Sequence, residues 1–270
     1  MKAFANHFLF ELRTGLRDKN LLLMNYLFPL GFFILIGLLM TKIYPGFNET
    51  LIPSMIIFSF LVSMILGMPS PIVTSREAGI FRTYKTNGIP AINIIIMPPL
   101  TTLLHTTLLS IIIISASHLF FNAPLPANWF WFILSLLITA FSLAGLGMLI
   151  GVISLNSRAT ILWSQLIFLP SMLIGGLMVP SSILPKALLK IGFLLPSTYA
   201  MNMFQGLAQN QTVLFNPAWS IIILLGTGIS AFGLAVYLFN WDSRNKTRKG
   251  NPLLAILALI PLIIGVIILP

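Results

Sequence analysis

Residues 75–90 read Ser-Arg-Glu-Ala-Gly-Ile-Phe-Arg-Thr-Tyr-Lys-Thr-Asn-Gly-Ile-Pro and separate two long apolar runs. The stretch carries four charged side chains, although only 7% of the residues in the chain are charged. Ile80 and Tyr84 share one stripe at helical spacing, and the ending Gly-Ile-Pro is typical of a helix stop. The pattern predicts a short amphipathic helix over residues 75–88 that lies in a membrane interface. A solvated connector between two spans is the alternative interpretation.

The composition of the chain points to lipid as its main solvent. Of its 270 residues, 57% are hydrophobic, and the charged share is far below the roughly 25% of soluble domains. The net charge is +10, but the basic residues cluster in short loops between apolar runs, so nucleic acid is not an expected partner. The chain has no cysteine, five acidic residues and three histidines, which leaves little for disulfides, metal sites or hydrolytic chemistry.

Apolar runs of about 20 residues match a hydrocarbon core of ~30 Å at 1.5 Å per residue. Such runs predict an all-α integral membrane protein with six core transmembrane helices. The predicted spans are Leu21–Met40, Leu51–Thr74, Ala91–Phe121, Trp129–Ile153, Ile161–Val179 and Ala218–Phe239. A further run, Pro252–Leu269, is just long enough to make 251–270 a seventh span at the carboxyl end.

Residues 1–20 mix phenylalanines and leucines with basic residues. Phe8, Leu12 and Leu16 recur at i, i+4 and i+8, which predicts an amphipathic helix at the interface rather than a signal peptide.

Residues 180–217 are interrupted by prolines and contain two apolar pieces, each too short to span a bilayer. Backbone at membrane depth needs internal hydrogen bonds, so we expect two short helices that enter the membrane and return. The sequence therefore predicts a re-entrant helical hairpin over residues 181–210.

Basic residues lie almost entirely on the side of the amino terminus. That side holds Lys2, Arg13, Arg17, Lys19, Arg76, Arg82, Lys85, Arg158, Arg244, Lys246, Arg248 and Lys249, and the other side holds Lys42, Lys186 and Lys190. The positive-inside rule then places the amino terminus, the 75–88 helix and the basic loop 241–250 in the cytoplasm, and the hairpin outside. The expected location is a cell membrane, in particular a bacterial plasma membrane.

Two features inside the spans carry further predictions. Gly145, Gly147 and Gly151 should let another helix approach the fourth span closely. His105 in the third span is either a proton-relay group or a hydrogen-bonding partner for a neighbouring helix.

Three segments resemble the permease subunits of ABC-2 type ABC transporters. They are Leu16–Asn20 before the first span; Arg76–Lys85 with its Gly-Ile-Pro ending; and Gly175–Pro180 followed by Leu-Pro and Leu-Pro-Ser-Thr-Tyr. The first is similar to the family's arginine–aspartate signature, the second to its coupling helix, and the third to its extracellular re-entrant helices. The resemblance makes 21–240 the transmembrane domain, while Pro98 and Pro99 and the seventh run depart from the common plan.

The resemblance implies a permease of an ATP-driven exporter for a hydrophobic or amphipathic substrate, such as a drug, a lipid-like molecule or a peptide. Its implied partners are a pair of ABC ATPase subunits, a second permease and membrane lipid. ATP and Mg would be used by the ATPase, since the chain has no phosphate-binding loop and no cofactor of its own.

The resemblance also implies roles for single residues. The expected ATPase-coupling residues are Arg76, Glu77, Gly79, Ile80, Phe81, Arg82, Tyr84 and Lys85, with Phe81 and Tyr84 as aromatic anchors. The expected amino-terminal collar comprises Arg13, Arg17 and Asp18, and the expected outer gate comprises Gly175, Gly176, Pro180, Pro185, Pro196 and Tyr199. No catalytic or metal-binding residue is expected.

Two other classes of function compete with this interpretation. An ion-coupled secondary transporter or channel would need ionisable residues within spans, and His105 is the candidate. An integral membrane enzyme would need an acid–base pair or a metal cluster, which the scattered acidic residues do not supply.

Overall fold

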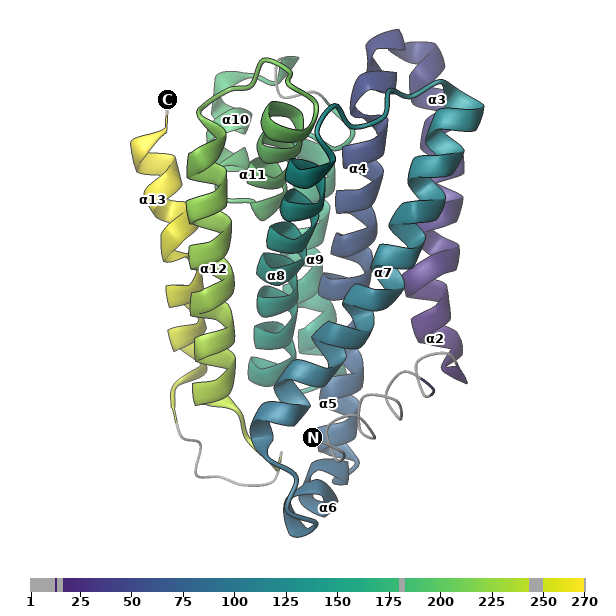
Figure 1. Cartoon of the computed structure of the whole chain (residues 1–270). Helices are drawn as coiled ribbons and strands as arrows, with labels where there is room; N and C mark the ends of the chain where they lie inside the picture. The colour runs from purple at the N-terminus through teal and green to yellow at the C-terminus, as the bar shows by residue number, and fades with distance from the viewer. Residues whose placement is uncertain (1–12, 14–16, 180–182, 243–249, 270) are drawn as a thin grey trace.

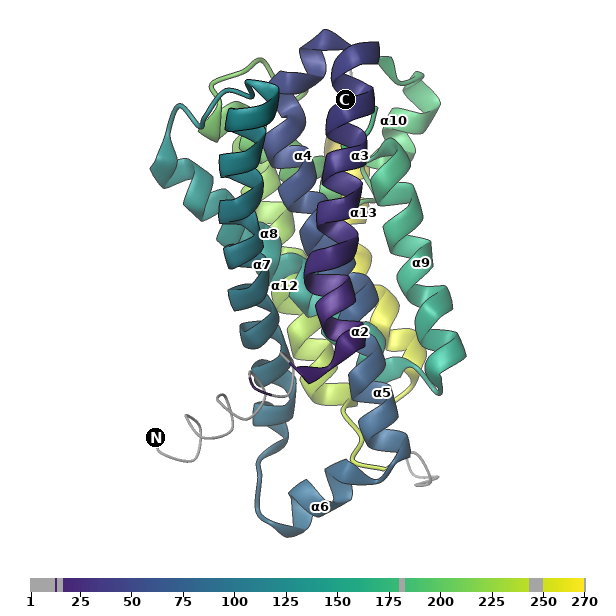
Figure 2. The same cartoon turned by 90° about the vertical axis from the view of Figure 1, so that its right-hand side faces the viewer.

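The structure, a computed structural model, describes residue 13 and residues 17–179, 183–242 and 250–269. Every regular element in this part of the chain is helical, and the long helices stand side by side in an upright bundle (Figures 1 and 2). The predicted all-α fold is therefore confirmed. Most of the interfacial helix predicted over residues 1–20 lies outside the described residues.

Six helical stretches of the described chain are long and apolar enough to cross a membrane, which confirms the predicted number of core spans. They are Lys19–Ile43, Asn48–Glu77, Ala91–Phe121, Trp129–Ile153, Ser157–Ile174 and Pro217–Leu238. The largest shift from the predicted bounds is in the fifth. It starts at Ser157 because the Asn156 side chain caps it, accepting from the Ala159 N–H at 2.9 Å. It ends at Ile174 because Gly175 and Gly176 follow, with Gly176 at a φ of 82°.

The first stretch consists of α2 (Lys19–Leu22), the π-helical segment η1 (Leu23–Leu27) and α3 (Phe28–Ile43). Asp18 caps its start by accepting hydrogen bonds from the N–H groups of Asn20 and Leu21 at 2.8 and 3.2 Å. In η1 the backbone N–H bonds reach five residues back, which widens the turn.

The second stretch follows a 3-10 turn, η2 (Pro45–Phe47), and consists of α4 (Asn48–Phe60), the π-helical η3 (Leu61–Gly67) and α5 (Pro69–Glu77). Its apolar window is 94% buried and that of α8 (Trp129–Ile153) is 83% buried, against 28% for the first stretch and 22% for α9 (Ser157–Ile174). The second and fourth stretches are therefore the centre of the bundle.

Glycines on α8 allow its close contacts with two neighbours. A Cβ at Gly147 would overlap the Met64 carbonyl group of η3, and one at Gly145 would lie 3.0 Å from the Gly228 carbonyl oxygen. Gly228 belongs to α12 (Pro217–Leu238). The predicted close approach of another helix to this glycine-rich face is confirmed.

Two short helices, α10 (Lys186–Gly192) and α11 (Pro196–Met203), follow α9, and the π-helical η5 (Phe204–Ala208) continues α11. They lie at the upper end of the bundle, opposite α6 (Ile80–Thr86), in both views (Figures 1 and 2). Each is shorter than a membrane span, as the sequence predicts for residues 181–210.

The last described segment begins as a 3-10 helix, η6 (Pro252–Leu259), and ends as α13 (Ile260–Ile268), next to α12 (Figure 1). A 3-10 helix rises about 2.0 Å per residue, whereas an α-helix rises 1.5 Å. The segment formed by η6 and α13 is therefore about 30 Å long. The 3-10 start thus gives a 17-residue segment the length of a hydrocarbon core.

The third stretch, α7 (Ala91–Phe121), connects the two ends of the bundle and crosses it obliquely (Figure 1).

Described basic residues gather at the end that carries α6, which we call the α6 end, and fewer lie at the α10–α11 end. The α6 end has Arg17, Lys19, Arg76, Arg82, Lys85 and Arg158; the other has Lys42, Lys186 and Lys190.

Candidate functional site

A break in the helix separates α5 from α6 at the α6 end. The Ala78 N–H donates to the Thr74 carbonyl at 2.9 Å and ends α5, and Gly79 then turns the chain with a φ of 78°. Glycine adopts this left-handed conformation without steric cost. The single helix predicted over residues 75–88 is thus divided, and its first three residues belong to the second spanning stretch.

Gly88 ends α6 in the same left-handed conformation, with a φ of 73°. Its N–H donates to the Lys85 carbonyl at 3.1 Å, and the Ile89 N–H donates to the Tyr84 carbonyl at 3.0 Å. This pair of bonds is the Schellman motif, so the helix stop that the sequence predicts is present. Pro90 then precedes the first turn of α7.

Replacing Gly79 with alanine tests the turn between α5 and α6. A Cβ at this position meets no atom within 4 Å, so the left-handed backbone is the source of the expected loss of about 1 kcal/mol in unfolding free energy. Gly79→Asn is the matched control, because asparagine tolerates this conformation better. Thermal unfolding of the purified protein should show Gly79→Asn to be more stable than Gly79→Ala. Equal stability of Gly79→Ala and wild type would contradict the strained turn.

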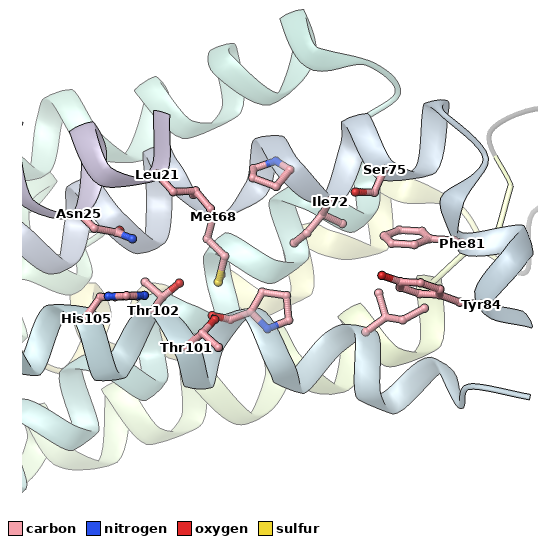
Figure 3. A pocket seen from close by; sticks show the side chains of 13 residues that line it. Leu21, Asn25, Met68, Ile72, Ser75, Phe81, Tyr84, Thr101, Thr102 and His105 are labelled. Carbon is pink, nitrogen blue, oxygen red and sulfur yellow. The ribbon is translucent and has the colours of Figure 1, made fainter. Parts of the chain in front are cut away.

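One face of α6 is held against the bundle by aromatic side chains. Phe81 is 4% exposed and packs against Tyr84 and Phe239, with ring centroids 6.2 and 5.8 Å apart. Trp241 extends the cluster at 5.2 Å from Phe239. Phe81 and Tyr84 lie next to each other and line a pocket beside Ile72 (Figure 3). Residues 239–242, which follow α12 and which we call the returning segment, therefore pack against the inner face of α6.

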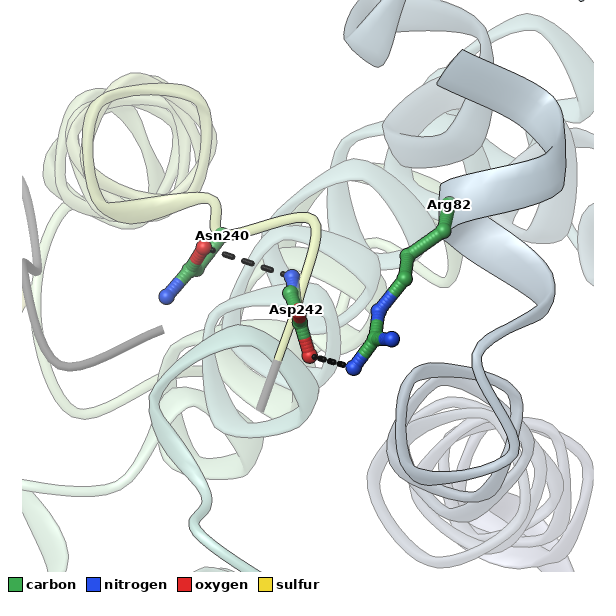
Figure 4. A network of polar contacts seen from close by, with 3 residues as sticks. All are labelled: Arg82, Asn240 and Asp242. Atoms are coloured by element: carbon green, nitrogen blue, oxygen red, sulfur yellow. Dashed lines mark hydrogen bonds and ion pairs between the residues drawn. The ribbon is translucent and has the colours of Figure 1, made fainter. Parts of the chain in front are cut away.

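An ion pair joins α6 to the same returning segment. The Arg82 Nη2 group lies 2.7 Å from Asp242 Oδ1, and the Asp242 N–H donates to Asn240 Oδ1 at 3.3 Å (Figure 4). The two charged side chains are 48% and 24% exposed, so water screens the pair. Such pairs contribute about 1 kcal/mol or less, and this one orients α6 more than it stabilises the fold.

Arg76 joins α5 to the end of α8. Its side chain is 5% exposed and donates to the Val152 carbonyl at 2.8 Å and to the Ser154 carbonyl. The last carbonyls of a helix lack partners within it and carry a partial negative charge. The guanidinium of Arg76 satisfies them, which explains how the cation is accommodated inside the protein.

The structure separates the predicted coupling residues into two groups. Arg76 and Phe81 are buried, and Gly79 and Tyr84 are half-buried. Glu77, Ile80, Arg82 and Lys85 are exposed, with Ile80 at 42%. The outer face of α6, together with Glu77 at the end of α5, is therefore a mixed surface of charged and apolar side chains, while the inner face of α6 packs against the bundle.

The other predicted site residues belong to elements other than α6. Arg13 and Arg17 are exposed, and Asp18 caps α2. At the α10–α11 end Gly175, Pro196 and Tyr199 are buried, Gly176 is half-buried and Pro185 is exposed, while Pro180 lies outside the described residues. The Tyr199 hydroxyl donates to the Phe193 carbonyl at 2.7 Å, which ties α11 to α10.

A cavity of about 490 Å³ lies at the α10–α11 end. Its lining includes the predicted gate residues Gly175 and Gly176 together with Glu49, Asn202 and Gln205. The Gln209 amide donates to the Glu49 carbonyl at 2.8 Å and links η5's end to the start of α4. Polar groups thus surround a space at the end of the bundle opposite α6.

Sequence reasoning missed Phe239, Trp241 and Asp242, which hold α6 in place. A usable signal was present, because Asp242 is the only acidic residue in the basic segment 241–250. It also missed Asn25, a polar residue inside an apolar span that the structure buries.

A bundle of six helices of spanning length and apolar composition defines a multi-pass membrane protein. Residues 8–208 match the family model of the ABC-2 type transporter. Since this match covers well over half of the chain, the protein belongs to the ABC-2 type transporter family and is a transport permease component. Membership implies partnership with an ABC ATPase subunit. No curated protein and no solved structure gives a significant match.

Proposed function

We propose that this chain is the permease subunit of an ATP-driven exporter, and that a separate ATPase docks on the outer face of α6. The observation that carries the proposal is the division of α6 into an exposed charged face and an inner face held by the bundle. A partner that binds the outer face would therefore act on a helix that cannot move alone.

Three connections would pass a displacement of α6 into the bundle. Gly79 joins it to α5, Phe81 packs on Phe239, and Arg82 pairs with Asp242. Arg76, one turn before the break, fixes the end of α5 to the end of α8. Motion at α6 would thus reach the two central stretches together, as rigid-body transmission requires.

Energy in this proposal comes from the partner. The sequence contains no Gly-x-x-x-x-Gly-Lys-Ser/Thr motif, so ATP and Mg would be bound by a pair of ABC ATPase subunits. The positive-inside rule supports a cytoplasmic α6 end and amino terminus. The membrane would be a bacterial plasma membrane. The segment 252–269 would then cross the membrane and place the carboxyl end outside.

The transport path would be completed by a second permease, identical or related. The cavity of about 490 Å³ between Gly175–Gly176, α11 and the start of α4 supports an outer gate at this end, where α10 and α11 would form the re-entrant hairpin. The apolar composition of the spans favours a hydrophobic or amphipathic cargo such as a drug, a lipid-like molecule or a peptide.

Charge reversal at exposed positions on and next to α6 tests the docking role. Lys85→Glu on α6, combined with Glu77→Lys at the last residue of α5, should weaken assembly with the ATPase at least about tenfold, because misplaced charges at an interface repel. Co-purification and ATP-driven transport in proteoliposomes measure the effect. Arg158→Glu, an exposed basic position at the same end, is the matched control and should retain assembly. Full assembly and transport in the double variant would refute docking on α6.

An ion-coupled transporter that works without an ATPase is the second candidate, supported by the buried His105 in α7. It predicts transport by the permease alone, driven by an ion gradient. Transport that requires ATP and the ATPase subunit would exclude it.

A further inference from the structure

A pocket of about 90 Å³ lies inside the α6 end, between the first stretch, α5, α6 and α7 (Figure 3). Phe81 and Tyr84 of α6 form one end of it, and Asn25 and His105 lie at the other. From Ile94 to His105 its wall follows α7 over eleven residue-to-residue steps, or about 16 Å. Ser75 and Tyr84 are half-buried whereas Asn25 and His105 are each 4% exposed, so the pocket opens toward α6.

Two π-helical segments adjoin this pocket. η1 contains Asn25, and η3 ends one residue before Met68, which also lines the pocket. The Met68 N–H donates to the Ser63 carbonyl at 2.9 Å, a bond that reaches five residues back. π-helical turns are rare and occur frequently at functional sites, where they change the direction in which side chains point.

The deep end of the pocket contains polar atoms that lack partners. The Tyr26 hydroxyl and His105 Nδ1 share a hydrogen bond of 2.7 Å, which leaves His105 Nε2 available. Neither His105 Nε2 nor Asn25 Oδ1 has a hydrogen-bond partner among the described residues. Figure 3 shows Asn25, Thr102 and His105 close together at this end. A buried polar atom without a partner is unfavourable, so a hydrogen-bonding group bound at this end would stabilise both side chains.

The lining of the pocket favours one chemical class of ligand. Met68 and Ile72 make the middle of the pocket apolar, and the polar side chains of Asn25, Thr102 and His105 lie at its deep end. The described lining contains no Asp, Glu, Lys or Arg, which favours an uncharged ligand. A lipid that enters with its acyl chain first would leave Asn25 and His105 unsatisfied.

We propose that this pocket binds an uncharged amphiphile whose hydroxyl or amide group hydrogen-bonds to Asn25 and His105 at the deep end. The apolar part of the ligand lies along Met68 and Ile72 and reaches Phe81 and Tyr84. The ligand therefore contacts the inner face of α6, opposite the surface proposed for the ATPase. The inference goes beyond the proposed function, because it concerns binding by the permease alone.

Photolabelling with a diazirine analogue of octanol tests the site. The sample is the permease alone, without the ATPase, in phosphatidylcholine nanodiscs. We expect saturable labelling of peptides that contain Met68–Ile72 and Thr101–His105, and competition by unlabelled octanol. The groove of about 430 Å³ between α7, α8 and α12, whose lining includes Leu103, Leu137 and Phe141, is the internal reference for lipid-like partitioning. Labelling there should rise linearly with concentration.

Asn25→Leu and His105→Leu should each raise the half-saturating concentration at the pocket about tenfold, which corresponds to ~1.4 kcal/mol. If these variants fold poorly, Thr102→Val removes a hydroxyl at the deep end, with Thr106→Val as its control. Thr106 is buried on the same helix, but its hydroxyl donates to the Thr102 carbonyl at 2.9 Å and it does not line the pocket. Weaker labelling in Thr102→Val alone supports the site.

Two results would overturn the proposal. One is labelling of the pocket that does not saturate, and the other is labelling that is the same as in wild type in Asn25→Leu, His105→Leu and Thr102→Val. Because the assay contains no ATPase, either result leaves the docking of α6 untouched, and a failure of docking leaves the pocket untouched.

Discussion

Arg76→Leu is expected to lower the free energy of unfolding by about 3 kcal/mol, which is the upper end of the usual range for a single substitution. The substitution removes two hydrogen bonds from a buried cation and leaves the Val152 and Ser154 carbonyls without that partner. Each hydrogen bond to a charged group contributes about 1.5–3 kcal/mol. Unfolding in a detergent titration measures the loss, and Arg76→Lys should recover part of it because the charge remains.

Arg82→Leu is the matched control for this experiment. It removes the same type of side chain at the same end of the bundle, but its pair with Asp242 is partly exposed, so the expected loss is about 1 kcal/mol or less. Equal losses in Arg76→Leu and Arg82→Leu would contradict the capping of α8 by Arg76.

Gly147→Ala is expected to be the most damaging small substitution in the bundle, at about 3 kcal/mol. The added methyl group would overlap the backbone carbonyl of Met64, which cannot move aside as a flexible side chain can. Both helices belong to the buried centre, so relief requires α8 and η3 to separate. Thermal unfolding and the yield of folded protein should both fall.

Gly233→Ala on α12 provides the comparison. A Cβ at Gly233 meets no atom within 4 Å, and alanine is the better helix former by roughly 1 kcal/mol, so this variant should equal or exceed wild type in stability. If Gly147→Ala behaved like Gly233→Ala, the close contact between α8 and η3 would be refuted.

Much of the architecture follows from local patterns. The length and hydropathy of each run set the six spans, and Gly145 and Gly147 marked the close helix contacts before the structure was known. Cap residues explain where the bounds differ, because Asn156 starts α9 four residues earlier than hydropathy alone indicates.

The environment of α6 could not be predicted in the same way. Phe81 contacts Phe239, and Arg82 contacts Asp242, across 158 and 160 residues of chain. Helical periodicity identified an amphipathic stretch but not which partner would cover Phe81. The charged residue Arg76 looked like a surface group, whereas two distant helix-end carbonyls make its burial favourable.

Backbone irregularities were also beyond the sequence pattern. Gly79 could have stayed within a helix, since a single helical glycine costs only about 1 kcal/mol relative to alanine. The π-helical turn at residues 23–27 has no comparable signal, because its apolar residues fit an ordinary helix equally well.

The support of α6 by residues 239–242 has a practical consequence for building hybrid permeases. The family match ends at residue 208, so a hybrid joined at that border would pair α6 of one parent with the returning segment of the other. A junction after residue 242 keeps both partners from the same parent. With the proposed docking of the ATPase on α6, hybrids made at the two borders from identical parents should therefore differ in how tightly they retain the ATPase subunit.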